Sequence, residues 1–269
     1  MTRSARRLLA AGLAWCLGGC VSTHYNLATQ HEDVTITSTD KEVEMGRALA
    51  RRVESALTVT PDVPMQERVR TIGEKLVAVC DRQEIIYSFE VVDDPSVNAF
   101  SLPGGYVFVH TGLLKIVAND DELAAVLAHE IGHITARHAV KRYESGLGAM
   151  AAQVGAIAAA RGGAGAGAGG VGVALQAAQL AYSREDELTA DRLGVTYMKA
   201  AGFNPKAVLS FLKTLQKEHR KELHYLPRGI IRPQYAMTHP FVPERIRAVK
   251  ETLFGVADYV DYLNAPAGR

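Results

Sequence analysis

Residues 119–143 read NDDELAAVLAHEIGHITARHAVKRY, and this stretch carries more helix signals than any other part of the chain. Asn119 is a preferred N-cap residue, and Glu122 stands three positions later, where it completes a capping box. Acidic residues fill the first turn and basic residues the last, and each charge is favourable at its end of the helix dipole. We therefore predict one helix over residues 120–143.

His129-Glu130-Ile131-Gly132-His133, in the middle of that helix, is an H-E-x-x-H motif. A spacing of four places both imidazoles on one face, one turn apart, so both can bind the same metal. Glu130 lies beside that face, where its carboxylate can take a proton from a water molecule at the metal. Neutral imidazoles suit zinc, and an open coordination position makes zinc catalytic. The motif predicts one Zn²⁺ per chain with Glu130 as general base; the alternative is two hydrogen-bonded core histidines.

A catalytic zinc needs a third protein ligand, and a second well-marked helix offers one. This helix is predicted over residues 184–201, with Ser183 as N-cap. Glu187 and Asp191 lie four positions apart on it, so Glu187 can bind the metal while Asp191 accepts a hydrogen bond from a ligating histidine. Acidic residues near a helix N-terminus are also favoured by the dipole alone. Spacing and composition therefore leave the third ligand open.

H-E-x-x-H on one helix and E-x-x-A-D on a later one resemble the zinc peptidases related to the CAAX prenyl endopeptidase. The similarity covers about residues 40–255 and includes NAFSLPGGYVFV (98–109), YSREDELTADR (182–192) and THPFVPER (238–245). Within that family the chain is most similar to the soluble bacterial members, the BepA-like proteases. Carried over by position, the resemblance implies three zinc ligands, a base and a supporting acid: His129, His133 and Glu187, then Glu130, then Asp191.

The remaining pattern predicts an α+β fold, a mostly helical zincin-like metalloprotease domain with a small sheet beside the H-E-x-x-H helix. Strands are expected over 85–92 and 106–110, with a Pro-Gly-Gly turn before the second. Further helices are expected over 40–57, 64–80, 204–218 and 242–254. An exposed strand edge near residues 98–110 can align an extended substrate by backbone hydrogen bonds. We expect the substrate-binding residues there to be Asn98, Ala99 and Phe100.

His239 precedes Pro240 in a predicted loop, outside any helix whose core would explain it. As a catalytic residue it would face the metal and stabilise the oxyanion of the tetrahedral intermediate. It could instead occupy the fourth coordination position and hold the site shut. The alternative is an ordinary loop histidine, exposed to water or capping the last helix.

The first nineteen residues are typical of a bacterial lipoprotein signal. Three arginines precede an apolar run over residues 8–17, and Leu17-Gly18-Gly19-Cys20 ends the run. Cleavage would leave a lipidated Cys20, which predicts a periplasmic protein anchored to the outer membrane; the alternative is an ordinary signal peptide with an incidental cysteine. Residues 20–39 lack a clear period and are predicted to be a tether, followed by the metalloprotease domain over 40–269.

Lys+Arg 30 against Asp+Glu 29 leaves no excess charge and no basic stripe for a nucleic-acid partner. The Gly/Ala-rich segment 145–175 is expected to be mobile and to act as a lid. The expected function is a zinc-dependent endopeptidase that degrades misfolded or unassembled outer-membrane or periplasmic proteins, with barrel-assembly components as further partners. Only 15 residues follow Phe254, so no tetratricopeptide array is expected there. The alternatives are a zinc-stabilised, chaperone-like binding module with suppressed proteolysis and a lipid-anchored structural protein.

Overall fold

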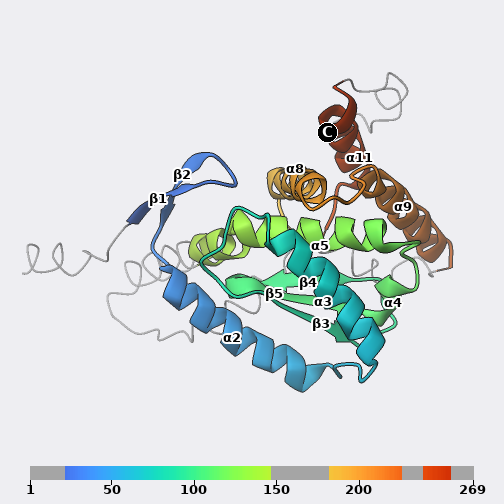
Figure 1. The fold of residues 1–269 in the computed structure, drawn as a ribbon, viewed down its shortest axis with the longest axis horizontal. Coiled ribbons are helices and arrows are strands. Elements are labelled where there is room, and N and C mark those ends of the chain that lie inside the picture. The colour runs from blue at the N-terminus through green and yellow to red at the C-terminus, as the bar shows by residue number, and fades with distance from the viewer. Residues whose placement is uncertain (1–21, 147–181, 226–238, 256–269) are drawn as a thin grey trace, which may run out of the picture.

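A three-stranded sheet lies at the centre of the structure, with helices on both of its faces (Figure 1). The computed structural model describes residues 22–146, 182–225 and 239–255. The sheet has the strand order β3-β5-β4 and consists of β3 (Ser88–Val92), β4 (Ala99–Leu102) and β5 (Tyr106–His110). β5 is the central strand, parallel to β3 and antiparallel to β4, so β3 and β4 form the two edges of the sheet.

Helices make up most of the described chain, so the predicted α+β fold with a small sheet is confirmed. They are α2 (Thr39–Ala56), α3 (Val63–Val77), α4 (Thr111–Leu114), α5 (Asp120–Thr135), α8 (Arg184–Ala200), α9 (Ala207–Tyr225) and α11 (Val242–Phe254). None of the helices in the described ranges is both long enough and apolar enough to span a membrane.

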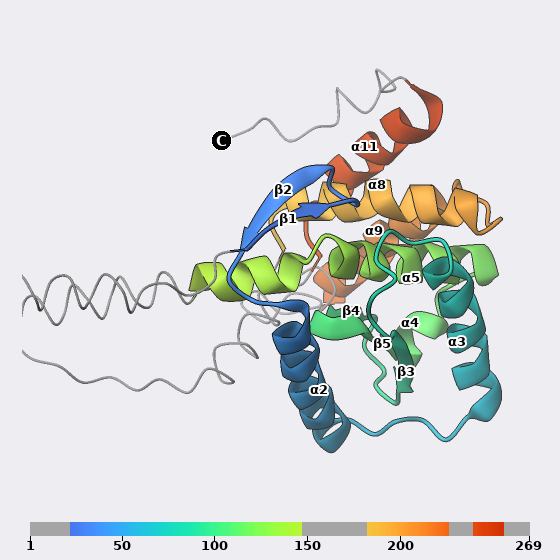
Figure 2. The same ribbon diagram turned by 60° about the vertical axis from the view of Figure 1, so that its left-hand side comes forward.

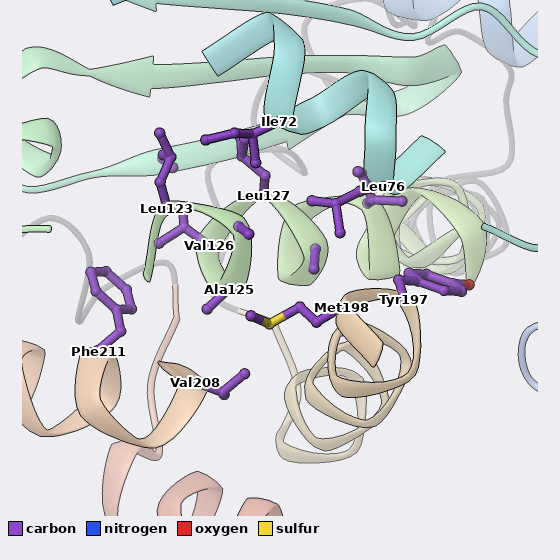
Figure 3. Packing of buried hydrophobic residues seen from close by; sticks show 14 of the residues in the cluster. Ile72, Leu76, Leu123, Ala125, Val126, Leu127, Tyr197, Met198, Val208 and Phe211 are labelled. Carbon is purple, nitrogen blue, oxygen red and sulfur yellow. The ribbon is translucent and has the colours of Figure 1, made fainter. Parts of the chain in front are cut away.

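Helix α5 lies in the middle of the main hydrophobic core (Figure 3). Its Leu123 and Leu127 are fully buried and belong to the same cluster as Leu76 of α3 and Val109 of the sheet. Its other side packs against α8 and α9, where Met198 contributes a fully buried side chain. Each such large apolar side chain stabilises the fold by about 1.5–3 kcal/mol. A second cluster covers the opposite face of the sheet, where α2 packs.

The H-E-x-x-H helix is shorter than predicted, because α5 ends at Thr135. Arg137 adopts a left-handed backbone conformation with φ 55°, and a second helical segment follows over residues 138–146. The predicted N-cap is confirmed, since the Asn119 side chain accepts a hydrogen bond from the backbone N–H of Glu122. The carboxylate of Glu122 does not complete a capping box; it accepts from the backbone N–H of Ala118 and from the Ser210 hydroxyl.

Strand β4 is not one of the two strands predicted from the sequence, which cover 85–92 and 106–110. The predicted Pro-Gly-Gly turn is a 3₁₀ turn, Pro103–Gly105, that joins β4 to β5. Gly104 has φ 76°, and a Cβ there would lie 2.8 Å from the Cα of Val43 on α2. Both facts require glycine at this position. The turn is therefore pressed against α2, which fixes how β4 enters the sheet.

Part of the predicted tether is folded, which corrects that expectation. Residues 22–35 form an antiparallel pair, β1 (Ser22–Asn26) and β2 (His31–Thr35). The Asn26 side chain donates to the carbonyl of Thr135, and Glu144 accepts from the backbone N–H of Thr37 at 2.8 Å. These hydrogen bonds attach the β1–β2 pair to the end of α5 and to the helical segment that follows it. The predicted signal lies outside the described residues, as do residues 147–175 of the predicted mobile segment.

Glu42 on α2 is the centre of a buried ionic network. Its carboxylate accepts two hydrogen bonds from Arg82, both at 2.8 Å, one from Arg137 at 2.9 Å and one from the backbone N–H of Gly104. Arg137 also donates to the carbonyl of Thr37 at 2.7 Å. Burial alone would raise the pKa of Glu42, but the hydrogen bonds and charges of the two arginines lower it. The network joins α2, the 3₁₀ turn, the end of α5 and the strand pair.

Replacing Glu42 by alanine should lower the free energy of unfolding by about 3–5 kcal/mol, because Arg137 and Arg82 lose the buried carboxylate that they share and Arg82 keeps only the half-exposed Glu84. A carboxyl group with a lowered folded pKa stabilises the fold above its ordinary value of 4.5, and this contribution is lost as the pH falls below that value. Urea denaturation of the parent and of Glu42→Ala should therefore show a smaller difference in the free energy of unfolding at pH 4 than at pH 7. Glu44→Ala, an exposed change on the same helix, should cost less than about 0.5 kcal/mol. Equal effects of the two changes would contradict the prediction.

Candidate metal centre

Four buried side chains from three parts of the chain bring metal-binding atoms together. His129 and His133 come from α5, Glu187 from α8, and His239 from the segment that leads into α11. One donor atom from each lies within 4.8 Å of all the others, and none of the four side chains is more than about 5% exposed. Figure 1 shows α8 and α11 beside α5, on the side of this helix that faces away from the sheet.

The distances between donor atoms fit a small tetrahedral cation. The Nε2 atoms of His129 and His133 are 3.1 Å apart, and the Glu187 carboxylate oxygens lie 3.5 Å and 3.4 Å from them. Tetrahedral zinc with bonds of about 2.0–2.1 Å separates its ligand atoms by about 3.3–3.4 Å. Two histidines and a carboxylate at these spacings therefore match the ligand set of a catalytic zinc site.

The protonation states also suit a metal. Burial lowers the pKa of His133 well below its ordinary value of 6.5, so its imidazole is neutral and can bind a cation. Burial would raise the pKa of Glu187, but the charges of Arg245 and His239 lower it well below its ordinary value. Neutral imidazole and ionised carboxylate are the forms that coordinate metals.

Glu130 lies next to this donor group and is fully buried. The Ser101 hydroxyl donates a hydrogen bond to Oε2 of Glu130 at 2.9 Å. The other oxygen, Oε1, has no hydrogen-bond partner among the described residues and lies 3.4 Å from Nε2 of His239. One oxygen is thus held by the protein, while the other faces the donor group.

Asp191 lies behind His129, one turn along α8 from Glu187. Its Oδ1 atom is 2.9 Å from Nδ1 of His129, the distance of a hydrogen bond that fixes the imidazole orientation. Arg245 of α11 donates to both oxygens of Asp191 at 2.8 Å, and its Nη1 atom lies 2.8 Å from Oε2 of Glu187. One guanidinium therefore connects Glu187 and Asp191, the two buried acidic residues of α8.

Residues 64–253 match peptidase family M48. The chain belongs to this family. The predicted resemblance to zinc peptidases of the CAAX prenyl endopeptidase type is confirmed, since M48 is a family of peptidases. The observation that supports this conclusion in the structure is the convergence of the H-E-x-x-H histidines with Glu187.

Several curated proteins resemble this M48 chain. It is 27% identical to the beta-barrel assembly-enhancing protease of Escherichia coli K12 over 217 residues, which are 78% of this chain and 43% of that protein. The protease of the same name from Yersinia pestis is 29% identical over the same shares. The mitochondrial metalloendopeptidase OMA1 of Schizosaccharomyces pombe is 32% identical over 69% of this chain and 52% of that protein. The M48 chain thus spans about half the length of these relatives.

Sequence reasoning missed four side chains around the M48 donor group. Tyr182 stacks on the His133 ring with centroids 3.7 Å apart, and Arg142 lies over the other face of Tyr182 at 3.7 Å. His138, which had no assigned role, places its Nδ1 atom 2.8 Å from Nδ1 of His133. Arg245 carried a signal: it occurs at helical spacing among apolar residues of α11, where only a paired arginine can be buried.

Of the predicted substrate-binding residues, Ala99 and Phe100 open strand β4 and Asn98 precedes it. Ala99 belongs to the core cluster that contains α5. The Phe100 ring stacks on Phe108 with centroids 5.3 Å apart and packs against the α2 cluster. Asn98 is 2% exposed, and its carbonyl accepts a hydrogen bond from His110 of β5. The structure thus places the side chain of Ala99 on the face of the sheet that carries α5 and that of Phe100 on the face that carries α2.

Replacing Asp191 by asparagine should weaken zinc binding about 10–100-fold, because the amide cannot hold the His129 imidazole as a carboxylate does. Zinc affinity can be measured by competition with a chelating dye. Glu185→Gln, an exposed change on the same helix, serves as the control and should bind zinc as the parent does. Parental affinity in Asp191→Asn would show that Asp191 does not support the ligand.

Proposed function

We propose that this M48 metallopeptidase is a zinc-dependent endopeptidase that cuts misfolded or unassembled proteins of the bacterial envelope. The observation that supports it best is the buried group of two imidazoles and a carboxylate, with Glu130 beside it. His129, His133 and Glu187 would hold one zinc ion. When bound, zinc would activate a water molecule and polarise the scissile carbonyl.

Glu130 is the proton carrier of the reaction. Its Oε1 atom takes the proton of the attacking water and later gives it to the leaving amine. Ser101 holds Oε2, so the carboxylate keeps one orientation through both transfers. Asp191 holds the His129 imidazole from behind, and Arg245 holds Asp191.

Strand β4 is proposed to align the substrate. It is an edge of the sheet and lies against α5, so an extended chain can pair with its outer side close to the donor group. Pairing through the backbone reads side chains weakly. This property suits a protease for unfolded proteins, and residues 98–100 would contribute mainly their backbone.

His239 is proposed to act as a fourth donor that keeps the site closed. Its Nδ1 atom lies 3.1 Å from Oε1 of Glu187 and 3.3 Å from Nε2 of His129, within the group that would hold the metal. His239 and Glu130 are both buried and lie 3.4 Å apart, so movement of His239 would open a path to Glu130. The second role considered for His239, stabilising the oxyanion, requires that it face the substrate carbonyl.

The place of action and the partners follow from the sequence and the relatives. A lipidated Cys20 would anchor the chain in the periplasm, on the outer membrane. Two relatives are named beta-barrel assembly-enhancing proteases, which suggests unassembled outer-membrane proteins as substrates and barrel-assembly components as partners. The complete burial of the donor group favours a second candidate function, a zinc-stabilised binding module in which proteolysis is suppressed.

Glu130→Gln should abolish digestion of an unfolded test protein, such as reduced casein, while it retains one zinc per chain. The amide cannot accept the proton of the attacking water, but it leaves the three ligands in place. Activity and zinc content should be measured for both forms of the mature protein. If both hold zinc and neither cuts, the suppressed binding module is favoured. If neither holds zinc, the proposed function is wrong.

His239→Ala should raise the basal rate of casein digestion, because a fourth donor no longer competes with water for the metal. Zinc content, measured in parallel, should stay at one ion per chain. A fall in kcat without loss of zinc would instead assign His239 to oxyanion stabilisation. Glu185→Gln provides the matched control, and its rate should equal that of the parent.

A further inference from the structure

The edge of the sheet opposite β4 carries a groove that the proposed reaction does not use. It has a volume of about 670 Å³ and lies where the end of α2 and the start of α3 approach β3. Figure 2 shows β3 between these two helices, with the connecting segment 57–62 passing across the bottom of the view. Apolar and acidic side chains line the groove together: Val59, Pro61, Val63 and Phe89, with Glu54 and Glu90.

The connecting segment covers only one end of the β3 edge. Val91 donates its backbone N–H to Gln66 and accepts a hydrogen bond from the backbone N–H of Thr60 at 2.9 Å. The segment forms a single bridge, Val59 with Val92. Backbone groups of alternate residues point to the same edge of a strand, so those of Phe89 face outward like those of Val91. On this outer edge, opposite β5, no strand in the described part of the chain pairs with β3 beside Phe89.

The groove also carries two acidic side chains, Glu54 and Glu90, whose mutual repulsion a bound cation would reduce. Oε2 of Glu90 is buried and has no hydrogen-bond partner among the described residues. Burial and the charge of Glu54 raise the pKa of Glu90, which shows that the two carboxylates repel each other there. The basic residue of the lining, Arg70, contacts Glu67 at 2.6 Å and Glu74 at 3.3 Å. No ion pair with Glu54 or Glu90 is present in the described chain.

We propose that this groove binds an extended peptide segment that carries a lysine or arginine between apolar side chains. The peptide backbone would pair with the open edge beside Phe89, as in strand addition to other sheets. Its cationic side chain would lie between Glu90 and Glu54. Its apolar side chains would cover Val59 and Val63, which are 38% and 72% exposed.

This surface is separate from the metal centre. The two sheet edges are two strand spacings apart, about 10 Å, and it is Ser101 of β4 that contacts Glu130 beside the donor group. Binding in the groove can therefore be measured without cleavage. The inference does not depend on the proposed function, and a failure of one leaves the other standing.

The test uses the mature chain with Glu130→Gln, so that no peptide is cut. The probe is a fluorescein-labelled 12-residue peptide of alternating valine, threonine and lysine. Its binding is measured by fluorescence anisotropy. A matched peptide has glutamine in place of lysine, and a third has proline at two central positions. The groove variant combines Glu54→Gln and Glu90→Gln. The control is Glu44→Gln, an exposed change on α2 whose residue does not line the groove.

We expect the groove variant to bind the lysine peptide about tenfold more weakly than the Glu44→Gln control, which corresponds to the loss of a partly buried ion pair. The glutamine and proline peptides should bind the parent more weakly than the lysine peptide by a similar factor. Hydrogen exchange should show protection of the Phe89 amide when the lysine peptide is present.

Three results would overturn the proposal. The first is equal affinity of the groove variant and the control, which would place the peptide at the β4 edge or elsewhere. The second is equal affinity for lysine and glutamine peptides, which would remove the role of charge. The third is an unprotected Phe89 amide, which would exclude strand addition. Thermal unfolding of each variant checks the fold, and removal of the repulsion between the two carboxylates should leave it intact.

Discussion

The burial of α5 on all sides is the constraint on which the rest of the structure depends. Every residue from Glu122 to Thr135 is buried, including two imidazoles and two carboxylates. A buried polar group without a partner costs about 1–3 kcal/mol, and a charged group costs more. The surrounding elements must therefore supply a partner for each of them. Much of the arrangement of α8, α11 and β4 follows from this requirement.

Two buried ionic networks, one around Arg245 and one around Glu42, hold the elements that surround α5. Arg245 reaches Glu187 and Asp191 from α11, and Asp191 in turn holds His129. Arg137 at the end of α5 shares the carboxylate of Glu42 with Arg82. The first network places the donor group, and the second fixes the 3₁₀ turn that joins β4 to β5. Ser101 of β4 holds Glu130, so the orientation of this carboxylate depends on how β4 enters the sheet.

Helix signals and motif spacing were enough to predict the central part of the fold and of the donor group. Capping by Asn119 and Ser183 and the spacing of His129 and His133 are local properties, and the structure contains them as predicted. Long-range contacts could not be read in this way. Nothing near Arg137 in the sequence shows that Glu42, 95 residues away, will hold it in a left-handed turn. The same is true of β4, which has only four residues and becomes a strand by pairing with β5.

Arg245 also determines what the acidic residues of α8 do before a metal binds. Two carboxylates buried together without a cation would repel each other, and each would also lose its hydration. The guanidinium contacts Glu187 at Oε2 and Asp191 at both oxygens, so both acids keep a counter-charge within the protein. The donor group can therefore be assembled by the fold itself. A cation would then enter ligands that are already in position, and Glu187 would divide its carboxylate between the metal and Arg245.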